Sequence, residues 1–357
     1  MTDNTDAIVG CLLGTAVGDA LGLPFEMMSR QRQLKAYPEI EGHHFFLGRG
    51  MFSDDTQHSC MVAQALIASN ADTEVFTREL ARQFRWWLLT LPAGTGKATL
   101  LSVLRLWIGV NPHNSGVFSA GNGPSMKSAL IGVCYGQDTV KMCQLVRAAT
   151  AITHTDPKAC FGAIAVAVAA GMASRGQPVS PPEFLDRLRD VLSNEDAGEF
   201  LDLVCRVVRS VTAGDDTLRF ADDLGLTKGV SGYTYHTVPV ALHSWLRHQG
   251  DYRGAVVDVI RCGGDTDTTG AITGAIMGAG VGKAGIPKQW LQNIREWPAT
   301  ISWIERLGIQ LAEVCSKGYA QRPLKVSVFG SLLRNVVFVL VVFAHLFRRM
   351  LPVRRGL

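Results

Sequence analysis

The chain has 357 residues, of which 47% are hydrophobic, so it can bury one large core or two of ordinary size. This composition excludes a disordered or low-complexity protein. The formal net charge of +4 depends on four arginines near the C-terminus, Arg348, Arg349, Arg354 and Arg355. The rest of the chain is near neutral, so we expect no nucleic-acid partner.

Apolar residues recur at helical spacing through almost the whole chain, and strand-like alternation is nearly absent. In chain order, the spacing predicts helices over residues 6–21, 54–69, 74–89, 97–108, 123–134, 138–151, 157–174, 197–212, 237–248, 251–261, 267–280 and 300–316. The fold class is therefore all-α. The composition changes sharply after Pro323, so we expect one helical domain over residues 1–322 and a tail over residues 323–357.

The tail contains an uninterrupted apolar run over residues 336–344, which approaches membrane-spanning length with its apolar neighbours. Arg334, Asn335 and His345 interrupt this segment, and an arginine at mid-bilayer costs about 2.5–3.5 kcal/mol. We therefore predict a helix on the inner face of the membrane, with its arginines on anionic headgroups. A terminal helix packed on the body or on another subunit is the competing interpretation.

The cysteines and the N-terminus indicate the compartment. The eight cysteines are scattered through apolar stretches without a CxxC pair, which is typical of buried thiols under reducing conditions. Residues 1–6 are polar and acidic, whereas a secretory signal begins basic and continues apolar. We expect the protein in the cytoplasm.

Two acidic turns each open an apolar helix, one at residues 53–56 and one at residues 263–269. The first alone is an ordinary serine N-cap with acids in the first helical turn. The second needs an irregular loop to bring its aspartates together, and Gly263 and Gly264 allow one. Carboxylate and hydroxyl oxygens without cysteine or histidine suit Mg²⁺ or Mn²⁺. Together the turns contribute four aspartates that would repel one another without two divalent cations, namely Asp54, Asp55, Asp265 and Asp267.

Four further features have both a structural and a functional interpretation. Glycines at every fourth position over residues 10–22 permit close helix packing. Glu26 is either an ordinary loop acid or a carboxylate beside the metal pair. Residues 121–123, Gly-Asn-Gly, form either a turn or a loop whose amides bind a phosphate or ribose oxygen. His154 is either a helix-terminal histidine or a substrate contact.

Five segments, taken in chain order, resemble the motifs of the ADP-ribosylglycohydrolase family. Residues 10–26 are similar to the family's opening glycine-rich segment with its acid, and residues 53–56 to its first metal motif. Residues 121–126 resemble its Gly-Asn-Gly-x-x-Met ligand loop, residues 151–154 its Thr-His turn, and residues 263–269 its second metal motif. The order and the number of matches make the resemblance specific.

The resemblance covers about residues 7–318 and implies a single domain of orthogonally packed helices, here with an appended apolar C-terminal helix. It implies two Mg²⁺ or Mn²⁺ ions bound by Ser53, Asp54, Asp55, Asp265, Asp267 and Thr268. It implies catalytic roles for Glu26, Asp55 and Asp267. It also implies substrate contacts from Ser119, Gly121, Asn122, Gly123 and His154.

The activity that the resemblance implies is removal of ADP-ribose from modified protein side chains, with arginine favoured, by two-metal-assisted hydrolysis of the glycosidic bond. The alternatives are an ADP-ribose-binding or toxin-neutralising protein on the same scaffold and a two-metal phosphohydrolase. The chain departs from the family's pattern at Lys127, where an arginine is common, and at Asp156, where some members have a second histidine. Both positions lie where we expect substrate selectivity to be decided.

Overall fold

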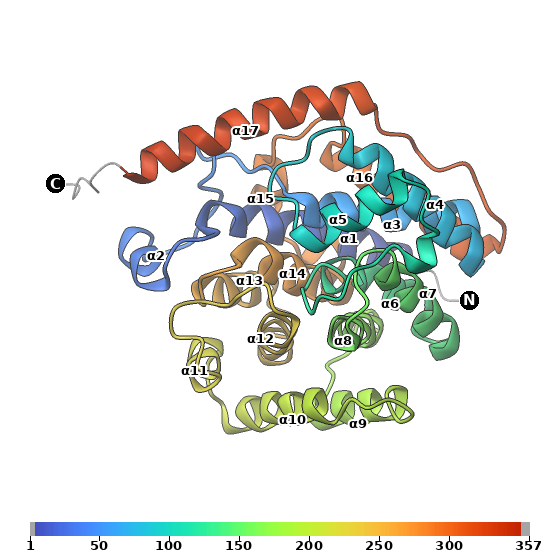
Figure 1. Cartoon of the computed structure of the whole chain (residues 1–357). Helices are drawn as coiled ribbons and strands as arrows, with labels where there is room; N and C mark the ends of the chain where they lie inside the picture. Colours follow the sequence, from blue (N-terminus) through green and yellow to red (C-terminus); the bar gives the residue numbers. More distant parts are fainter. Residues whose placement is uncertain (1–3, 351–357) are drawn as a thin grey trace.

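The computed structural model describes residues 4–350, and it is built from helices (Figure 1). In this part of the chain, β-type pairing is limited to isolated bridges such as the one between Val230 and Gly264. The prediction of an all-α fold is therefore confirmed.

The helices follow one another with short connections. The first half of the chain forms α1 (Thr5–Gly22), η1 (Leu23–Phe25), α2 (Arg30–Ala36), α3 (Asp54–Ser69), α4 (Thr73–Leu88), α5 (Lys97–Trp107), η2 (Pro112–Asn114), η3 (Ser125–Lys127), α6 (Ala129–Tyr135), α7 (Thr139–Ala151) and α8 (Pro157–Ala173). The second half forms α9 (Pro181–Val191), α10 (Gly198–Ala213), α11 (Thr217–Asp223), α12 (Thr234–Arg247), α13 (Tyr252–Arg261), α14 (Thr266–Gly285), α15 (Lys288–Asn293), α16 (Ile301–Lys317) and α17 (Val328–Met350).

The predicted helices are present, with two kinds of difference. The helix expected over residues 123–134 begins only at Ala129, because the preceding residues form the short helix η3 under the Gly-Asn-Gly loop. There the backbone carbonyl of Asn122 accepts from the amides of Ser125 and Met126. The sequence also fails to predict α2, α9, α11 and α15, which have 6 to 11 residues. Three of them have no more than 7 residues, whereas α9 does bury Phe184, Leu185 and Leu188 on one face, a pattern that was available in the sequence.

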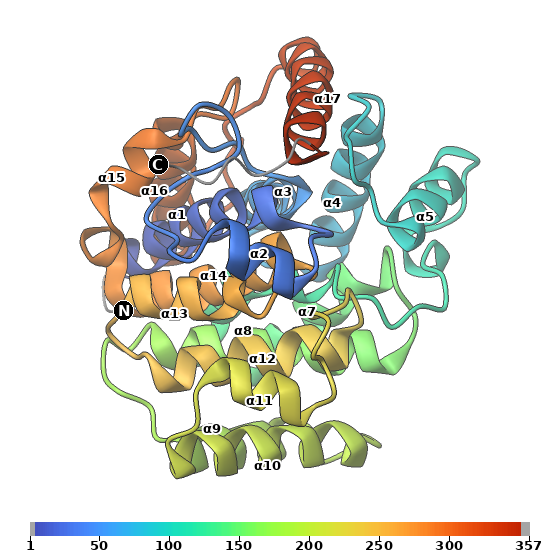
Figure 2. The same cartoon turned by 90° about the vertical axis from the view of Figure 1, so that its left-hand side faces the viewer.

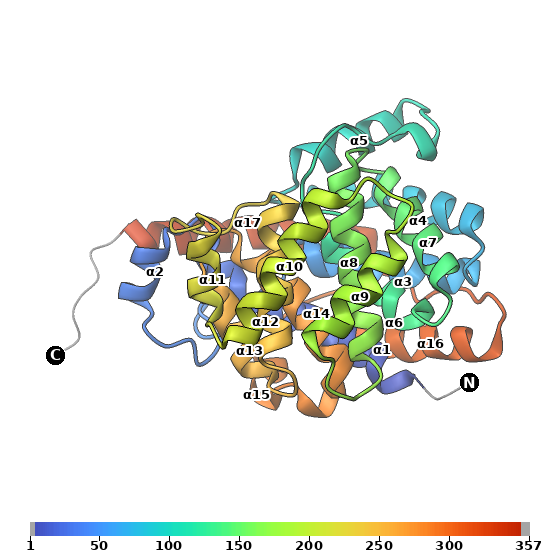
Figure 3. The same cartoon turned by 90° about the horizontal axis from the view of Figure 1, so that it is seen from below.

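Helices α1 and α14 lie in the middle of the molecule, between α9 and α10 on one side and α17 on the opposite side (Figures 1 and 2). The view from below shows α9 and α10 in front of α8 and α12 (Figure 3). The central pair carries few polar residues and is almost wholly buried. The core therefore surrounds this pair, and polar residues on it need a specific explanation.

Glycines let α1 and α14 approach at backbone distance. A Cβ atom on Gly10, Gly14, Gly18 or Gly22 would lie only 2.0–2.2 Å from a carbonyl oxygen of α14. Real Cβ atoms do not approach this closely, so no larger residue fits without moving a helix. The packing interpretation of the four-residue glycine spacing is confirmed. The same contact brings the C-terminal part of α1 against the first turn of α14.

Helix α17 crosses the outside of the body and packs on it through one face. Phe338 and Val341 are buried in a small apolar cluster with Leu23, Phe45 and Met51. The three polar residues that interrupt the apolar run all face the body and form hydrogen bonds there: Arg334, Asn335 and His345. These three side chains contact protein, as in the competing interpretation of a terminal helix packed on the body. The side chains of Arg348 and Arg349, together with Arg354 and Arg355, lie outside the described part of the structure.

Two described helices are long and apolar enough to cross a bilayer by composition alone. The segment that begins with α1 is entirely buried inside the protein, as expected of a core helix. The most apolar window of α17 is only 28% buried, so most of its outer surface faces solvent.

Candidate active site

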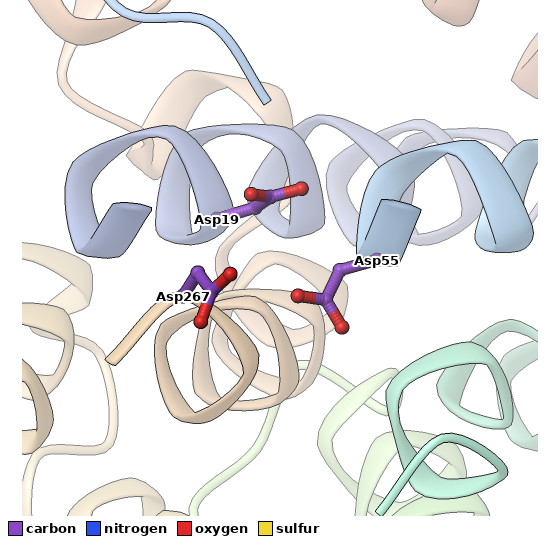
Figure 4. A group of neighbouring side chains, drawn as sticks. All are labelled: Asp19, Asp55 and Asp267. Carbon is purple, nitrogen blue, oxygen red and sulfur yellow. The ribbon is translucent and has the colours of Figure 1, made fainter. Parts of the chain in front are cut away.

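Three buried aspartates converge from three different helices. Asp19 comes from α1, Asp55 from the first turn of α3 and Asp267 from the first turn of α14, and their carboxylates point toward one another (Figure 4). One oxygen of each lies within 4.8 Å of the others. Helix N-termini favour negative charge, which explains why two of the three occupy first turns. The structure thus joins the two acidic turns that the sequence places more than 200 residues apart.

Asp19 fixes the start of α3. Its carboxylate accepts hydrogen bonds from the Ser53 amide at 2.9 and 3.0 Å, from the Thr56 amide at 3.1 Å and from the Thr56 hydroxyl at 2.6 Å. Burial raises the pKa of Asp19 to about 6, although these hydrogen bonds favour the ionised form. No role for Asp19 was predicted from the sequence. The available signal was an acid in the middle of an apolar helical stripe.

Asp55 has one satisfied oxygen and one without a partner. Its Oδ2 accepts from the hydroxyls of Ser53 at 3.1 Å and Thr268 at 3.3 Å, and Ser53 also caps α3 by accepting from the Asp55 amide at 3.2 Å. Its Oδ1 is buried and finds no hydrogen-bond partner among the described residues. A buried acceptor of this kind costs about 1–3 kcal/mol unless something binds it.

The other acidic side chains add to an unfavourable concentration of negative charge. Burial, then the charges of Asp19, Glu26 and Asp265, raises the pKa of Asp54 to about 7. Burial, then the charge of Glu26, holds the pKa of Asp267 well above its usual range. Cations relieve such repulsion, and the oxygen-only donor set with an unpaired carboxylate oxygen fits Mg²⁺ or Mn²⁺.

The Gly-Asn-Gly loop is attached to the second acidic turn. The side-chain amide of Asn122 donates to Asp265 Oδ2 at 2.6 Å and to the Thr237 hydroxyl at 3.0 Å. The Gly121 amide donates to the Ser119 hydroxyl at 3.3 Å. Asp265 itself is the N-cap residue of α14. The predicted ligand loop and the predicted metal turn are therefore neighbours.

His154 lies against the same loop. A Cβ atom on Gly121 or Gly123 would lie 3.1 Å from the imidazole, so the glycines make room for the ring. Burial, then the charge of Lys127, lowers the pKa of His154 to about 3, which keeps the imidazole neutral. The ammonium of Lys127 is also buried and donates to the Gly123 carbonyl at 2.8 Å, while burial lowers its pKa to about 7.

Asp156 and His58 lie near this loop and make structural contacts. Asp156, where some family members have a histidine, caps α8 by accepting from the Lys158 amide at 2.9 Å. His58, which the sequence analysis does not mention, is buried on α3 between the rings of Phe84 and Trp87. Burial, then nearby positive charge, holds the pKa of His58 well below its usual range. It lies one turn after the first acidic turn, and both of its ring nitrogens are buried without a hydrogen-bond partner among the described residues.

The fold and the acidic cluster define an all-α protein with three buried aspartates close enough to share a ligand. The sequence profile of the ADP-ribosylglycohydrolase family matches residues 1–321. The chain belongs to the ADP-ribosylglycohydrolase family, whose members are metal-dependent hydrolases that act on ADP-ribose linkages.

Individual relatives agree with this assignment. An uncharacterized protein of Archaeoglobus fulgidus is 30% identical over 85% of this chain and 95% of its own. ADP-ribosylhydrolase ARH3 of Gallus gallus is 28% identical over 82% of this chain and 89% of its own. The ADP-ribosyl-[dinitrogen reductase] glycohydrolase of Rhodospirillum rubrum is 23% identical over 81% and 90%. A solved chain of an ADP-ribosylglycohydrolase-related protein complex superposes with a TM-score of 0.65 at 25% identity, over 88% of this chain and 100% of that chain.

Proposed function

We propose that this protein hydrolyses the glycosidic bond between ADP-ribose and a modified protein side chain. The observation that supports this most directly is the unpaired, buried Oδ1 of Asp55 inside a cluster of carboxylates, beside the Gly-Asn-Gly loop. An inert binding protein has no use for buried acids whose charges destabilise its fold. In a site that holds cations, by contrast, the same buried acids serve as ligands.

The residues around the cluster would divide the work. The cations would be held by Ser53, Asp54, Asp55, Asp265, Asp267 and Thr268, with Asp19 fixing the loop that carries the first three. When bound, two Mg²⁺ or Mn²⁺ ions would neutralise the carboxylates, grip ribose hydroxyls and make a water more acidic. Glu26, whose charge is felt at Asp54 and Asp267, would assist proton transfer as the anomeric carbon becomes oxocarbenium-like.

The remainder of ADP-ribose would lie on the Gly-Asn-Gly loop. The Gly121 and Gly123 backbone offers close approach to a phosphate or ribose oxygen because no side chain stands in the way. A neutral His154 can donate or accept a hydrogen bond there. Ser119 and Asn122 would fix the loop and complete the contact.

We propose arginine as the favoured acceptor side chain. The partly exposed carboxylates of Glu26 and Asp54 suit a cationic guanidinium leaving group better than a neutral hydroxyl.

The test is product analysis on matched arginine-linked and serine-linked ADP-ribosyl peptides, each with Mg²⁺, with Mn²⁺ and with a chelator. We expect free ADP-ribose, faster from the arginine peptide, and none with the chelator. Release of AMP or phosphate would instead indicate a phosphohydrolase. Tight binding without any product would indicate an ADP-ribose-binding or toxin-neutralising protein. Faster turnover of the serine peptide would refute the arginine preference alone.

We also propose a cytoplasmic enzyme that contacts an anionic membrane through the outer face of α17. Apolar residues recur on this face at spacings of three and four, and they are half to three-quarters exposed: Phe329, Leu333, Val336, Leu340, Phe343 and Phe347. No acidic residue follows Glu313, whereas eight lysines and arginines do. This charge favours anionic headgroups and disfavours pairing of two copies of the helix.

Vesicle sedimentation tests the membrane contact. The full chain is expected to sediment with vesicles that contain phosphatidylglycerol and not with neutral phosphatidylcholine vesicles. Leu340→Glu should abolish this binding without loss of activity. Equal sedimentation of the wild-type protein and Leu340→Glu would refute the contact. A dimer that Leu340→Glu converts to monomer would show that a second copy covers this face instead.

A further inference from the structure

The residue before the first acidic turn is held by a buried ion pair. The backbone amide of Phe52 donates to Glu296 Oε1 at 3.0 Å, and Arg334 Nη2 donates to the Phe52 carbonyl at 2.5 Å. Arg334 Nε donates to Glu296 Oε2 at 3.0 Å, and Arg334 Nη2 also contacts Glu296 Oε1. The two charged side chains are only 4% and 1% exposed. Both backbone groups of Phe52 are thus fixed one residue before Ser53.

A second contact of α17 lies close in sequence to Glu26. His345 Nε2 is 2.9 Å from the carbonyl oxygen of Pro24, two residues before Glu26. The apolar cluster under α17 also contains Leu23, at the start of the same short helix, and Met51, beside Phe52. Helix α17 therefore contacts two segments, the one that precedes Ser53 and the one that precedes Glu26.

The matched part of the chain ends at residue 321, so α17 is an addition to the family domain. An appended helix that only covered apolar surface would not need a buried arginine, because burying an ion pair is costly unless its geometry is good. Here the arginine is used to bind the backbone of the segment that leads into the first acidic turn.

We infer that α17 is a positioning element of the metal site, and that Arg334 acts through Phe52 to fix the positions of Ser53 and Asp55. This inference rests on the proposed function, in which Ser53 and Asp55 hold a cation. Residues that orient metal ligands from behind typically change metal affinity 10- to 100-fold when they are replaced.

The experiment measures Mn²⁺ binding to the full-length, metal-free protein by electron paramagnetic resonance. Arg334→Met is expected to weaken Mn²⁺ binding at least about tenfold. Because this variant leaves Glu296 buried and unpaired, the double variant Arg334→Met, Glu296→Leu is made as well, since apolar replacement of both members of a buried ion pair is often neutral for stability. It should show the same loss of affinity with a cooperative thermal transition. Excess Mn²⁺ should restore kcat, which it would not do for a misfolded protein.

The matched control is Asn335→Ala on the same helix. Asn335 is buried and donates to the Thr90 carbonyl at 2.8 Å and hydroxyl at 3.0 Å. It also accepts from Arg334 Nη1 at 3.1 Å, but Asn335→Ala leaves in place the bonds that Arg334 makes to Glu296 and Phe52 through Nε and Nη2. Its Mn²⁺ affinity should stay within about twofold of the wild-type value. An equal loss in Asn335→Ala, or wild-type affinity in the double variant, would overturn the inference. If the inference fails but Asp55→Asn binds Mn²⁺ more weakly than the wild-type protein, the proposed metal site stands. If the wild-type protein itself does not bind Mn²⁺, both the inference and the proposed metal site fail.

Discussion

Replacing Asp55 by asparagine should make the metal-free protein more stable and the enzyme inactive. The asparagine keeps a carbonyl oxygen where Oδ2 accepts from Ser53 and Thr268. Its amide group replaces the unpaired Oδ1 and can donate to the neighbouring carboxylates of Asp19 and Asp267. The substitution therefore removes a repulsive charge and satisfies a buried position at the same time.

The magnitudes follow from the two states of the site. Relief of a buried, unsatisfied acceptor contributes about 1–3 kcal/mol to the unfolding free energy of the metal-free variant. In the wild-type protein, cations at 100 times their Kd contribute about 2.7 kcal/mol for each site, which for a chain of this size is a rise in Tm of about 4 °C. The variant lacks a ligand, so its Tm should not respond to cations.

The assay measures Tm by thermal unfolding without Mn²⁺ and at Mn²⁺ concentrations raised in 10-fold steps. ADP-ribose release is measured in parallel. Asp202→Asn removes the same charge from an exposed position on α10 and serves as the control, with an expected change within about 0.5 kcal/mol. A metal-free Asp55→Asn that is less stable than the wild-type protein would contradict the electrostatic argument. A wild-type-like rise in Tm with Mn²⁺ would contradict the assignment of Asp55 as a ligand.

Three further outcomes are expected. Gly18→Ala places a Cβ 2.0 Å from an α14 carbonyl and should cost about 3 kcal/mol or more by urea unfolding, whereas Gly198→Ala, with open space around it, should be neutral; equal costs would refute the close contact. His243 is fully buried, and burial lowers its pKa from 6.5 to about 4. The unfolded chain therefore binds a proton first, so His243 should contribute about 3 kcal/mol to the loss of stability between pH 6.5 and 4, and the loss should be smaller by about that amount in His243→Gln. Lys127→Met should raise KM more than it lowers kcat, because it frees the Gly123 carbonyl; an unchanged KM would show that the loop does not depend on it.

The helices and the two acidic turns were predictable because their signals are local. An apolar stripe, a serine cap and acids in a first turn all lie within a few residues of one another. Asp19 was not predictable as the residue that fixes α3, because its partners Ser53 and Thr56 are 34 and 37 positions away. From the sequence it is one acid among glycines on an apolar helix.

The tail shows a different limit. The mean hydropathy of a segment depends on which residues it contains and not on the direction in which their side chains point. The partners of Arg334, Asn335 and His345 lie 38, 245 and 321 positions away, respectively, so nothing near them in the sequence shows that they face protein. Their spacing places them on one side of the helix, which was the available clue.

The close seam between α1 and α14 has a consequence for synthesis. Thr266 donates to the carbonyl of Gly22 across 244 positions of sequence, so α1 leaves the ribosome long before its partner exists. At about 5–20 residues per second this interval is about 12–50 s. During it the chain presents an apolar helix near its N-terminus that is long enough to cross a bilayer and whose native burial is complete. The carboxylates of Asp19 and Asp267 therefore cannot meet until the start of α14 has been synthesised.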